Sequence, residues 1–311
     1  MRAISTKGMS REEWLEQRTN GIGGSDLAAV CGVSRWKTPL DVWLEKTGKG
    51  IPTQDNKYLE AGRRLESAVA QWYADQTGRK VIFDHKIRRH RRYHFLIGDF
   101  DRIIVANPPE YSTGILEVKT ASHQMFDEWK EGNIPLEYML QIQHYMFVSG
   151  HRWGSFAVLG GGVDFLYIDL NYSPDFILPY ERQAVKFWRE HVLKDIPPDP
   201  MTREDVERLY PKAEGGVIEA NTLIYDTWER YQALADEKAQ IEAEMENIKT
   251  QFAILMKDAK EVRFGERVLA TYNETESEIF DKARLKKENS FIYNRYAKKI
   301  NRRTLRIKRR R

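Results

Sequence analysis

The fold is decided by Gly98–Thr120, which reads GDFDRIIVANPPEYSTGILEVKT. Ile103–Val105 and Ile115–Val118 have the β-branched, apolar composition of short buried strands. The segment between them contains Asn107, two prolines and Gly114, which are typical of turns. The stretch therefore predicts a β-hairpin at the centre of an α/β domain.

The second strand of this hairpin carries an acid and a base. Side chains alternate between the two faces of a strand, so Glu117 and Lys119 point the same way, and the end of the first strand brings Asp101 close to them. Two carboxylates can hold Mg²⁺ or Mn²⁺ with water, and a lysine beside them can orient or deprotonate a water molecule. The hairpin therefore predicts a phosphodiester-hydrolysing site, and a solvated ion pair on an exposed face is the alternative.

Composition and length describe an ordinary globular protein. The chain has 311 residues, of which 41% are hydrophobic and 31% charged, enough for one large domain or a domain plus an appendage. The single cysteine, Cys31, excludes a disulfide framework and a four-cysteine metal site. No apolar run has the length of a membrane span, and the N-terminus lacks a signal-peptide core. We expect a cytoplasmic protein without a membrane partner.

The charge is distributed unevenly along the chain. Residues Lys282–Arg311 contain fourteen Lys or Arg and one acid, Glu288, and so carry a charge of +13. Because the net charge of the whole chain is +4, residues 1–281 carry −9. A basic end on an acidic body predicts local contact with a polyanion such as nucleic acid. A disordered, solubilising tail is the alternative.

A glycine-rich segment near the N-terminus predicts an anion site. Ser25 follows Gly23 and Gly24 and is suited to cap a short helix, whose free amides attract anions. Arg18, seven residues upstream, can add a positive charge to the same site. A tight turn explains the glycines equally well.

Two later helices carry polar residues where apolar ones are expected. In a long helix that ends at Gly78, Glu66 shares the apolar stripe with Val69, so its carboxylate needs an arginine, for which Arg63 is the candidate, or a metal as partner. In the apolar helix that begins at Pro135, Gln141 and Tyr145 are four residues apart and share a face. Their polar tips need partners, and the acidic site and its substrate are the nearest candidates.

The order of elements predicts two domains. Residues 1–198 alternate helices with about five strands, which predicts one α/β core domain with a mixed sheet and helices on both sides. We expect Trp36 and Trp43 to pack in this core. A proline-rich segment, Asp195–Pro200, marks its end, and residues 199–311 form a separate C-terminal extension.

The extension has the texture of a helical appendage. Apolar residues recur in steps of three and four from Ile224 to Leu255, which predicts a long amphipathic helix able to pair with another helix. From the sequence, this pattern is too short and too irregular to require a coiled-coil dimer. A small hairpin around Gly265, a basic helix over Lys282–Lys299 and a terminal strand over Arg303–Lys308 complete the prediction.

Five short motifs occur in order between about Ser10 and Gly150. They are Trp14-Leu15-x-x-Arg18 leading into Gly23-Gly24-Ser25-Asp26, Gly62-x-x-Leu65-Glu66, Asp101-Arg102, Gly114-x-Leu116-Glu117-x-Lys119-Thr120 and Gln141-x-Gln143-His144-Tyr145. Together they resemble the YqaJ-type viral recombinase family, the phage alkaline exonucleases related to lambda exonuclease, within the PD-(D/E)xK nuclease superfamily. The resemblance implies a restriction-endonuclease-like fold, a mixed central β-sheet flanked by helices.

The resemblance also assigns roles in metal binding and hydrolysis. It implies that Asp101 and Glu117 are ligands of Mg²⁺, for which Mn²⁺ can substitute, and that the Val118 carbonyl contributes. Lys119 would orient or activate the attacking water. Glu66 would complete the metal environment.

Further positions match family motifs outside the hairpin. Gln141 and Tyr145 match the catalytic helix motif of the RecB-like branch, and Arg18 and Ser25 match positions that bind a terminal 5′ phosphate. Two departures from the superfamily pattern occur: Phe100 replaces the superfamily proline, and Asp99 competes with Asp101 for the role of metal ligand. Asp101 is favoured because an arginine follows it, as in relatives.

The implied activity is the digestion of linear double-stranded DNA from its 5′ ends, which leaves 3′ single strands for a phage single-strand annealing protein. Relatives form trimeric rings around DNA in the cytoplasm of a bacterial host, so the resemblance implies a homo-oligomer. One alternative has the same hydrolytic chemistry but another substrate: a PD-(D/E)xK endonuclease or a RecB-like repair nuclease. Another is a non-catalytic DNA-binding recombination partner.

Overall fold

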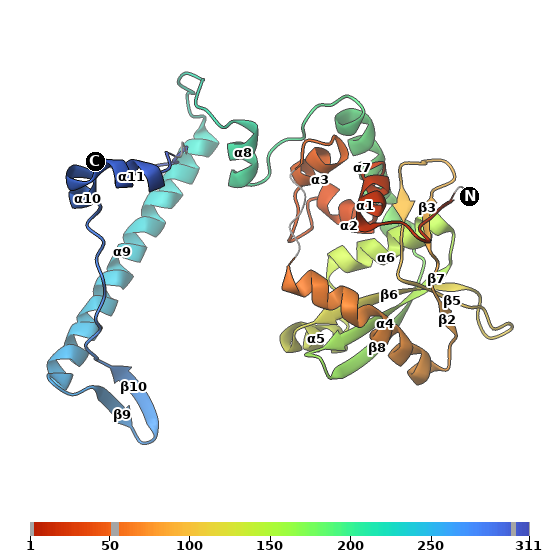
Figure 1. Cartoon of the computed structure of the whole chain (residues 1–311), viewed down its shortest axis with the longest axis horizontal. Coiled ribbons are helices and arrows are strands. Elements are labelled where there is room, and N and C mark those ends of the chain that lie inside the picture. Colours follow the sequence, from red (N-terminus) through yellow and green to blue (C-terminus); the bar gives the residue numbers. More distant parts are fainter. Residues whose placement is uncertain (1–2, 51–55, 300–302, 311) are drawn as a thin grey trace. The chain divides into compact units, whose positions relative to one another are not determined.

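The computed structural model describes residues 3–50, 56–299 and 303–310. The chain divides into two compact units, residues 1–209 and 210–311, which are drawn in Figure 1. Each unit is described by itself. Helix α8 (Arg203–Leu209) belongs to the first unit, where the Thr38 hydroxyl donates a hydrogen bond to Asp205 at 3.0 Å.

The first unit alternates helices and strands along the chain. Its helices are α1 (Arg11–Thr19), α2 (Gly24–Val30), α3 (Pro39–Lys46), α4 (Lys57–Thr77), α5 (His123–Lys130), α6 (Leu136–Ser149), α7 (Pro174–Phe187), the π-helical turn η1 (Trp188–Val192) and α8. Its strands are β1 (Ala3–Ser5), β2 (Val81–Ile82), β3 (Lys86–Arg89), β4 (Ile97–Gly98), β5 (Arg102–Ile104), β6 (Gly114–Ala121), β7 (Trp153–Gly160) and β8 (Asp164–Asn171).

A mixed five-stranded sheet forms the centre of this unit. Its order is β2-β5-β6-β7-β8. The hairpin pair β5–β6 is antiparallel, whereas β6 and β7 run parallel and are joined by a crossover through α5 and α6. The strands β1, β3 and β4 form a smaller antiparallel sheet. The predicted mixed α/β fold, with the hairpin at its centre, is confirmed.

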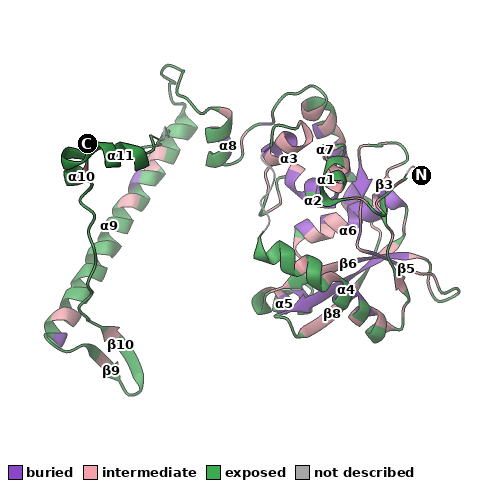
Figure 2. Ribbon diagram, viewed as in Figure 1, coloured by how far each residue is buried: buried purple, intermediate pink, exposed green. Residues whose placement is uncertain are grey.

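Helices cover both faces of the central sheet, and its middle strands are buried (Figures 1 and 2). Along β7, Phe156 and Val158 pack in the cluster formed with α5 and α6. The alternate residues, Ala157 and Leu159, pack with Val69 and its neighbours on α4. This period of two places every second residue of β6 and β7 toward α6, which decides where the polar side chains of β6 point.

One tryptophan prediction is wrong. Trp43 is buried as expected, but Trp36 is 78% exposed. The Ser34 hydroxyl accepts hydrogen bonds from the Trp36 and Lys37 amides, and Arg35 binds Glu137 on α6, so the connection between α2 and α3 is held with the indole outside. A local turn therefore overrides the preference of the side chain for the core.

A buried pair of a histidine on α6 and a glutamate on α7 holds these two helices together. His144 Nδ1 lies 2.7 Å from the Glu181 carboxylate and Nε2 lies 2.9 Å from the Ile97 carbonyl oxygen. Both partners are acceptors, which suits a protonated ring. Burial alone would lower the pKa of His144, but Glu181 and the Ile97 carbonyl raise it above its ordinary value.

This pair predicts a pH-dependent stability. Because the folded pKa of His144 is raised, the pair stabilises the fold fully below the ordinary value of about 6.5, and this contribution is lost as pH rises through the raised pKa. We expect urea unfolding of the Glu181→Gln variant to show a flatter decline in the free energy of unfolding above pH 6.5 than the wild type. Glu190→Gln, on the same stretch of chain but half exposed, should keep the wild-type profile.

The second unit is built on one long helix, α9 (Thr222–Met256), with a hairpin of β9 (Glu261–Phe264) and β10 (Arg267–Thr271) and two short helices, α10 (Lys282–Glu288) and α11 (Ser290–Tyr296). The predicted long helix and hairpin are therefore present, and the predicted basic helix is divided in two. Within the described part of the chain, no helix is long and apolar enough to cross a membrane.

The predicted terminal strand over Arg303–Lys308 is wrong: the described residues 303–310 contain no strand. Side chains of α9 bind this segment instead. Trp228 and Gln232 each donate to the Lys308 carbonyl at 2.9 Å, and the Arg310 amide donates to Gln232 at 3.1 Å.

Candidate active site

The candidate site begins where β5 stops pairing with β6. Arg102 is paired with Leu116, so Asp101 lies just beyond the end of the two-stranded ladder. Its carboxylate accepts a hydrogen bond from the Val118 amide at 2.7 Å and so replaces the missing strand as a partner of β6. The N–H and C=O groups of one strand residue point to the same side, which directs the Val118 carbonyl toward Asp101 as well.

Four side chains meet on the face of the sheet that α6 covers. Lys119 Nζ donates to Glu117 Oε1 and to Gln141 Oε1, both at 2.8 Å. The Gln141 amide donates to Glu117 Oε1 at 2.6 Å and lies 3.2 Å from the Tyr145 hydroxyl. The structure thus brings together the polar residues that the sequence predicts on β6 and on the apolar helix.

Burial and neighbouring charge perturb the acids of this group. Burial raises the pKa of Asp101 well above its usual range, and the charges of Glu117 and Glu66 add to this effect. The pKa of Glu117 is also raised by burial, although Lys119 opposes the shift. Burial would lower the pKa of Lys119, but Glu117 and Asp101 raise it. Lys119 is therefore an ammonium with two acceptors, suited to orienting a polar group.

The acidic group suits a hard divalent cation. Glu117 Oε1 is occupied by two donors, but Oε2 is buried and finds no hydrogen-bond partner among the described residues. A cation beside Oε2 and Asp101 would satisfy this atom and relieve the repulsion between the carboxylates. No three or more His, Cys, Asp or Glu side chains in the described ranges are arranged to hold a metal. The ligands would be two carboxylates, the Val118 carbonyl and water, a set that Mg²⁺ accepts.

Glu66 lies beside this group but is bound to an arginine. Arg102 Nη1 is 2.5 Å from Glu66 Oε1, and Arg102 Nη2 donates to the Ser67 hydroxyl at 3.0 Å. Arg102 is only 3% exposed, so this pair fixes α4 against β5. The sequence predicts an arginine or metal partner for Glu66 but does not single out Arg102, although this residue directly follows Asp101.

The predicted phosphate-binding residues lie close to each other. Arg18 Nη2 is 3.4 Å from the Ser25 hydroxyl, and the guanidinium lies 4.6 Å from the centre of the Trp14 ring. The Trp14 indole donates to Asp99 at 2.6 Å. Asp99 therefore supports Arg18 through Trp14, whereas Asp101 accepts its hydrogen bond from the Val118 amide in the acidic group.

A buried ion pair behind Arg18 is missed by the sequence. Lys46 Nζ lies 2.8 Å from Asp26 and donates to the Arg18 carbonyl at 3.1 Å. Burial would raise the pKa of Asp26, but Lys46 and Lys37 hold it far below its usual range. The sequence signal that could have indicated a fixed role for Asp26 is its place in the first turn of α2, where a carboxylate can cap the helix. In the structure this carboxylate accepts a hydrogen bond from the Gly23 amide at 3.1 Å.

A close contact at Gly24 connects the helix that carries Ser25 to the helix beside the acidic group. A Cβ atom on Gly24 would lie 2.8 Å from Gln141 Cγ and 2.8 Å from Tyr145 Cε1. Helix α2, which carries Ser25, therefore crosses α6 at the residues that reach the acidic group. Only glycine allows this close approach.

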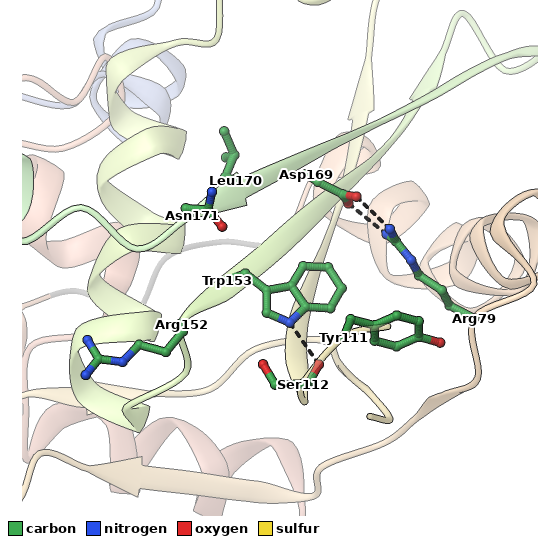
Figure 3. Close-up of a pocket in the computed structure, with 8 residues that line it drawn as sticks. All are labelled: Arg79, Tyr111, Ser112, Arg152, Trp153, Asp169, Leu170 and Asn171. Atoms are coloured by element: carbon green, nitrogen blue, oxygen red, sulfur yellow. Dashed lines mark hydrogen bonds and ion pairs between the residues drawn. The ribbon is translucent and has the colours of Figure 1, made fainter. Parts of the chain in front are cut away.

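A shallow hollow of about 400 Å³ lies at the other end of β7 (Figure 3). Arg79 forms two hydrogen bonds with Asp169, at 2.8 and 2.7 Å, and its guanidinium lies 5.1 Å from the centre of the Trp153 ring. Trp153 begins β7, whereas Glu117 is paired with Phe156 further along the strand. The hollow is therefore lined by Arg79 and the side chains that hold it, and it lies outside the candidate site.

Comparison with known proteins gives consistent results. A family model for the YqaJ-like viral recombinase domain matches residues 13–152. The uncharacterized protein YqaJ of Bacillus subtilis (strain 168) is 31% identical over 309 residues, which cover 96% of this chain and 95% of that protein. An alkaline exonuclease (LHK-Exo) from Laribacter hongkongensis is similar at a TM-score of 0.49 and 17% identity, over 60% of this chain and 94% of that one. A phage-related exonuclease from Haemophilus somnus 129PT gives 0.43 and 15%, over 56% and 96%.

The fold and the site define an α/β protein with a carboxylate–lysine centre on the hairpin of its central sheet. Within this class, the chain belongs to the YqaJ-like viral recombinase family. The family predicted from the five sequence motifs is confirmed.

The Gly24 contact gives a direct test of the site's architecture. We expect Gly24→Ala to lower the free energy of unfolding by about 1–3 kcal/mol, because the added methyl group overlaps Gln141 and Tyr145. Gly62→Ala is the matched control, since its Cβ would meet nothing nearer than Thr120 Oγ1 at 4.0 Å. Urea unfolding measures both, and equal stability of the two variants would contradict the close crossing of α2 and α6.

Proposed function

We propose that this protein is a metal-dependent deoxyribonuclease that digests linear double-stranded DNA from its 5′ ends and leaves 3′ single strands for recombination by strand annealing. One observation carries the proposal: the unpartnered, buried Oε2 of Glu117 beside Asp101, with Lys119 on the same face of β6. Membership of a viral recombinase family supports a role in DNA recombination.

The residues of the site have distinct parts in this proposal. Asp101, Glu117 and the Val118 carbonyl would hold Mg²⁺, or Mn²⁺ in its place. The bound ion would supply Lewis acidity at the scissile phosphate and a more acidic water. Lys119, which is held by two acceptors at 2.8 Å, would orient the attacking water and offset charge on the phosphate. Gln141 would keep both Lys119 and Glu117 in position.

Two further residues support this arrangement. The Tyr145 hydroxyl accepts a hydrogen bond from the Gln141 amide at 3.2 Å and so helps to hold Gln141 in position. Glu66 would act on the metal environment through its charge, since its carboxylate is paired with Arg102.

The surroundings of Arg18 and Ser25 support the proposed 5′ polarity. Ser25 is exposed, and its hydroxyl and the Arg18 guanidinium are both donors that can bind a terminal 5′ phosphate. Because α2 touches α6 at Gly24, a phosphate bound there lies near the acidic group. The first phosphodiester bond of a 5′ end would then be the one presented for hydrolysis.

The proposal includes the partners that the resemblance implies. They are double-stranded DNA ends, a phage single-strand annealing protein and further copies of the chain in a trimeric ring. The proposed organisation is a nuclease core over residues 1–198 and a C-terminal extension over 199–311 that contacts DNA or another subunit. The +13 charge of residues 282–311 supports contact with DNA.

The decisive assay follows the two ends of a linear duplex separately. We expect Mg²⁺-dependent release of a 5′ label well before a 3′ label, no release with EDTA and no cutting of a covalently closed circle. Lys119→Ala should lower the rate by at least about 100-fold, because it removes the charge that orients water and phosphate. Lys130→Ala, an exposed lysine on α5, should leave the rate unchanged.

The same assay separates the alternatives. Cutting of the circle would indicate an endonuclease, and early release of the 3′ label would contradict the proposed polarity. Binding of DNA without cleavage under Mg²⁺ or Mn²⁺ would indicate a non-catalytic recombination partner.

A further inference from the structure

Helix α9 carries an apolar seam along its whole length. Within this helix, all of whose residues are described, only Gln232 and Met256 are buried. Ten positions alternate strictly in steps of three and four residues, and eight of them are apolar. This seam consists of Ile224, Thr227, Tyr231, Leu234, Lys238, Ile241, Met245, Ile248, Phe252 and Leu255.

The structure explains why the apolar pattern looks irregular in the sequence. Trp228 interrupts the alternation, but its indole donates to the Lys308 carbonyl at 2.9 Å, and Gln232 and Asp236 also bind the terminal segment. These residues form a separate side of α9, which the described residues 303–310 occupy. Without Trp228, the seam keeps an unbroken period of 3.5 residues.

The seam itself is uncovered. Ile224, Met245 and Leu255 are 56%, 53% and 68% exposed, and Ile241 is 51% exposed. Single exposed apolar residues are ordinary, but a continuous stripe on a 35-residue helix is not. A period of 3.5 matches the seam of a left-handed coiled coil and therefore calls for a helical partner with the same period.

We propose that α9 pairs with α9 of another copy of this chain, parallel and in register, through this seam. The seam spans more than four heptads, whereas three to four suffice for a coiled coil. An identical helix has the required period and length by construction. The proposal concerns residues beyond the matched domain, 13–152, and adds a two-fold contact between C-terminal extensions to the trimeric ring proposed above. It does not depend on the nuclease activity.

Charges beside the seam favour the parallel arrangement. In a parallel pair, Glu244 of one helix lies opposite Lys249 of the other, an attraction, and Glu237 lies opposite Glu242, a repulsion; each contact occurs twice. In the fully overlapped antiparallel alignment, Glu237 lies opposite Glu244 and no pair of opposite charges forms along the flanks. The parallel arrangement is therefore the more complementary one.

The one charged seam residue supports the same choice. In the parallel pair, the two Lys238 side chains share a layer whose rims carry Glu237 and Glu242, so their ammonium groups reach carboxylates. Lys238 already lies 3.5 Å from Glu242 within one helix. In the antiparallel alignment, Lys238 would oppose Ile241, an apolar partner. A single polar residue of this kind fixes the register of a coiled coil.

Cysteine cross-linking of the full-length chain tests the proposal. In a Cys31→Ser background, Ile248→Cys places a thiol on the seam, and Ile254→Cys places one off it on the same helix. Ile254 is the more exposed of the two, 67% against 46%, so random encounters favour the control. Under mild oxidation we expect the residue 248 thiols to form a disulfide-linked dimer at least tenfold faster than those at 254, because in-register parallel helices bring 248 against 248.

Equal rates at the two positions, or no dimer at 248, would overturn the proposal. Cross-linking at 248 only when Tyr231→Cys is added would show antiparallel helices and overturn the parallel arrangement. Light scattering gives a second readout: Ile241→Lys should shift the dissociation midpoint at least tenfold to higher concentration, and Ile254→Lys should not. Loss of nuclease activity is measured separately and has no bearing on these outcomes.

Discussion

The hydrogen bond from the Val118 amide to the Asp101 carboxylate is the contact on which the site depends. It joins the end of β5 to β6 at the point where the strand ladder stops, and so fixes one acid beside another, Glu117. Glu117 is buried on a face covered by α6, where Lys119 and Gln141 occupy one of its oxygens and the other finds no partner among the described residues. A cation beside the two carboxylates, as in the proposed metal site, would balance their charges.

The contact of α2 with α6 extends this site toward the N-terminus. Gly24 lets α2 approach Gln141 and Tyr145, and the buried pair of Lys46 and Asp26 holds the backbone of Arg18 behind it. The proposed phosphate-binding position and the acidic group thus belong to one arrangement of helices on the sheet. The proposed direction of digestion would be a consequence of this packing.

Sequence reasoning succeeded where a short period governs position. Alternation along β6 placed Glu117 and Lys119 on one face, and helical spacing placed Gln141 and Tyr145 together. It could not choose Asp101 over Asp99 from geometry, because the choice depends on where β5 stops pairing. It missed the partner of Glu66, which comes from another element, and misplaced Trp36, whose exposure follows from a local turn at Ser34.

Anomalous diffraction from crystals of the protein soaked in Mn²⁺ would locate the metal. We expect a peak bound by Asp101, Glu117 Oε2 and the Val118 carbonyl, and its loss in Asp101→Asn but not in Asp99→Asn. A peak elsewhere, or none at saturating Mn²⁺, would contradict a metal-dependent hydrolytic site on this hairpin.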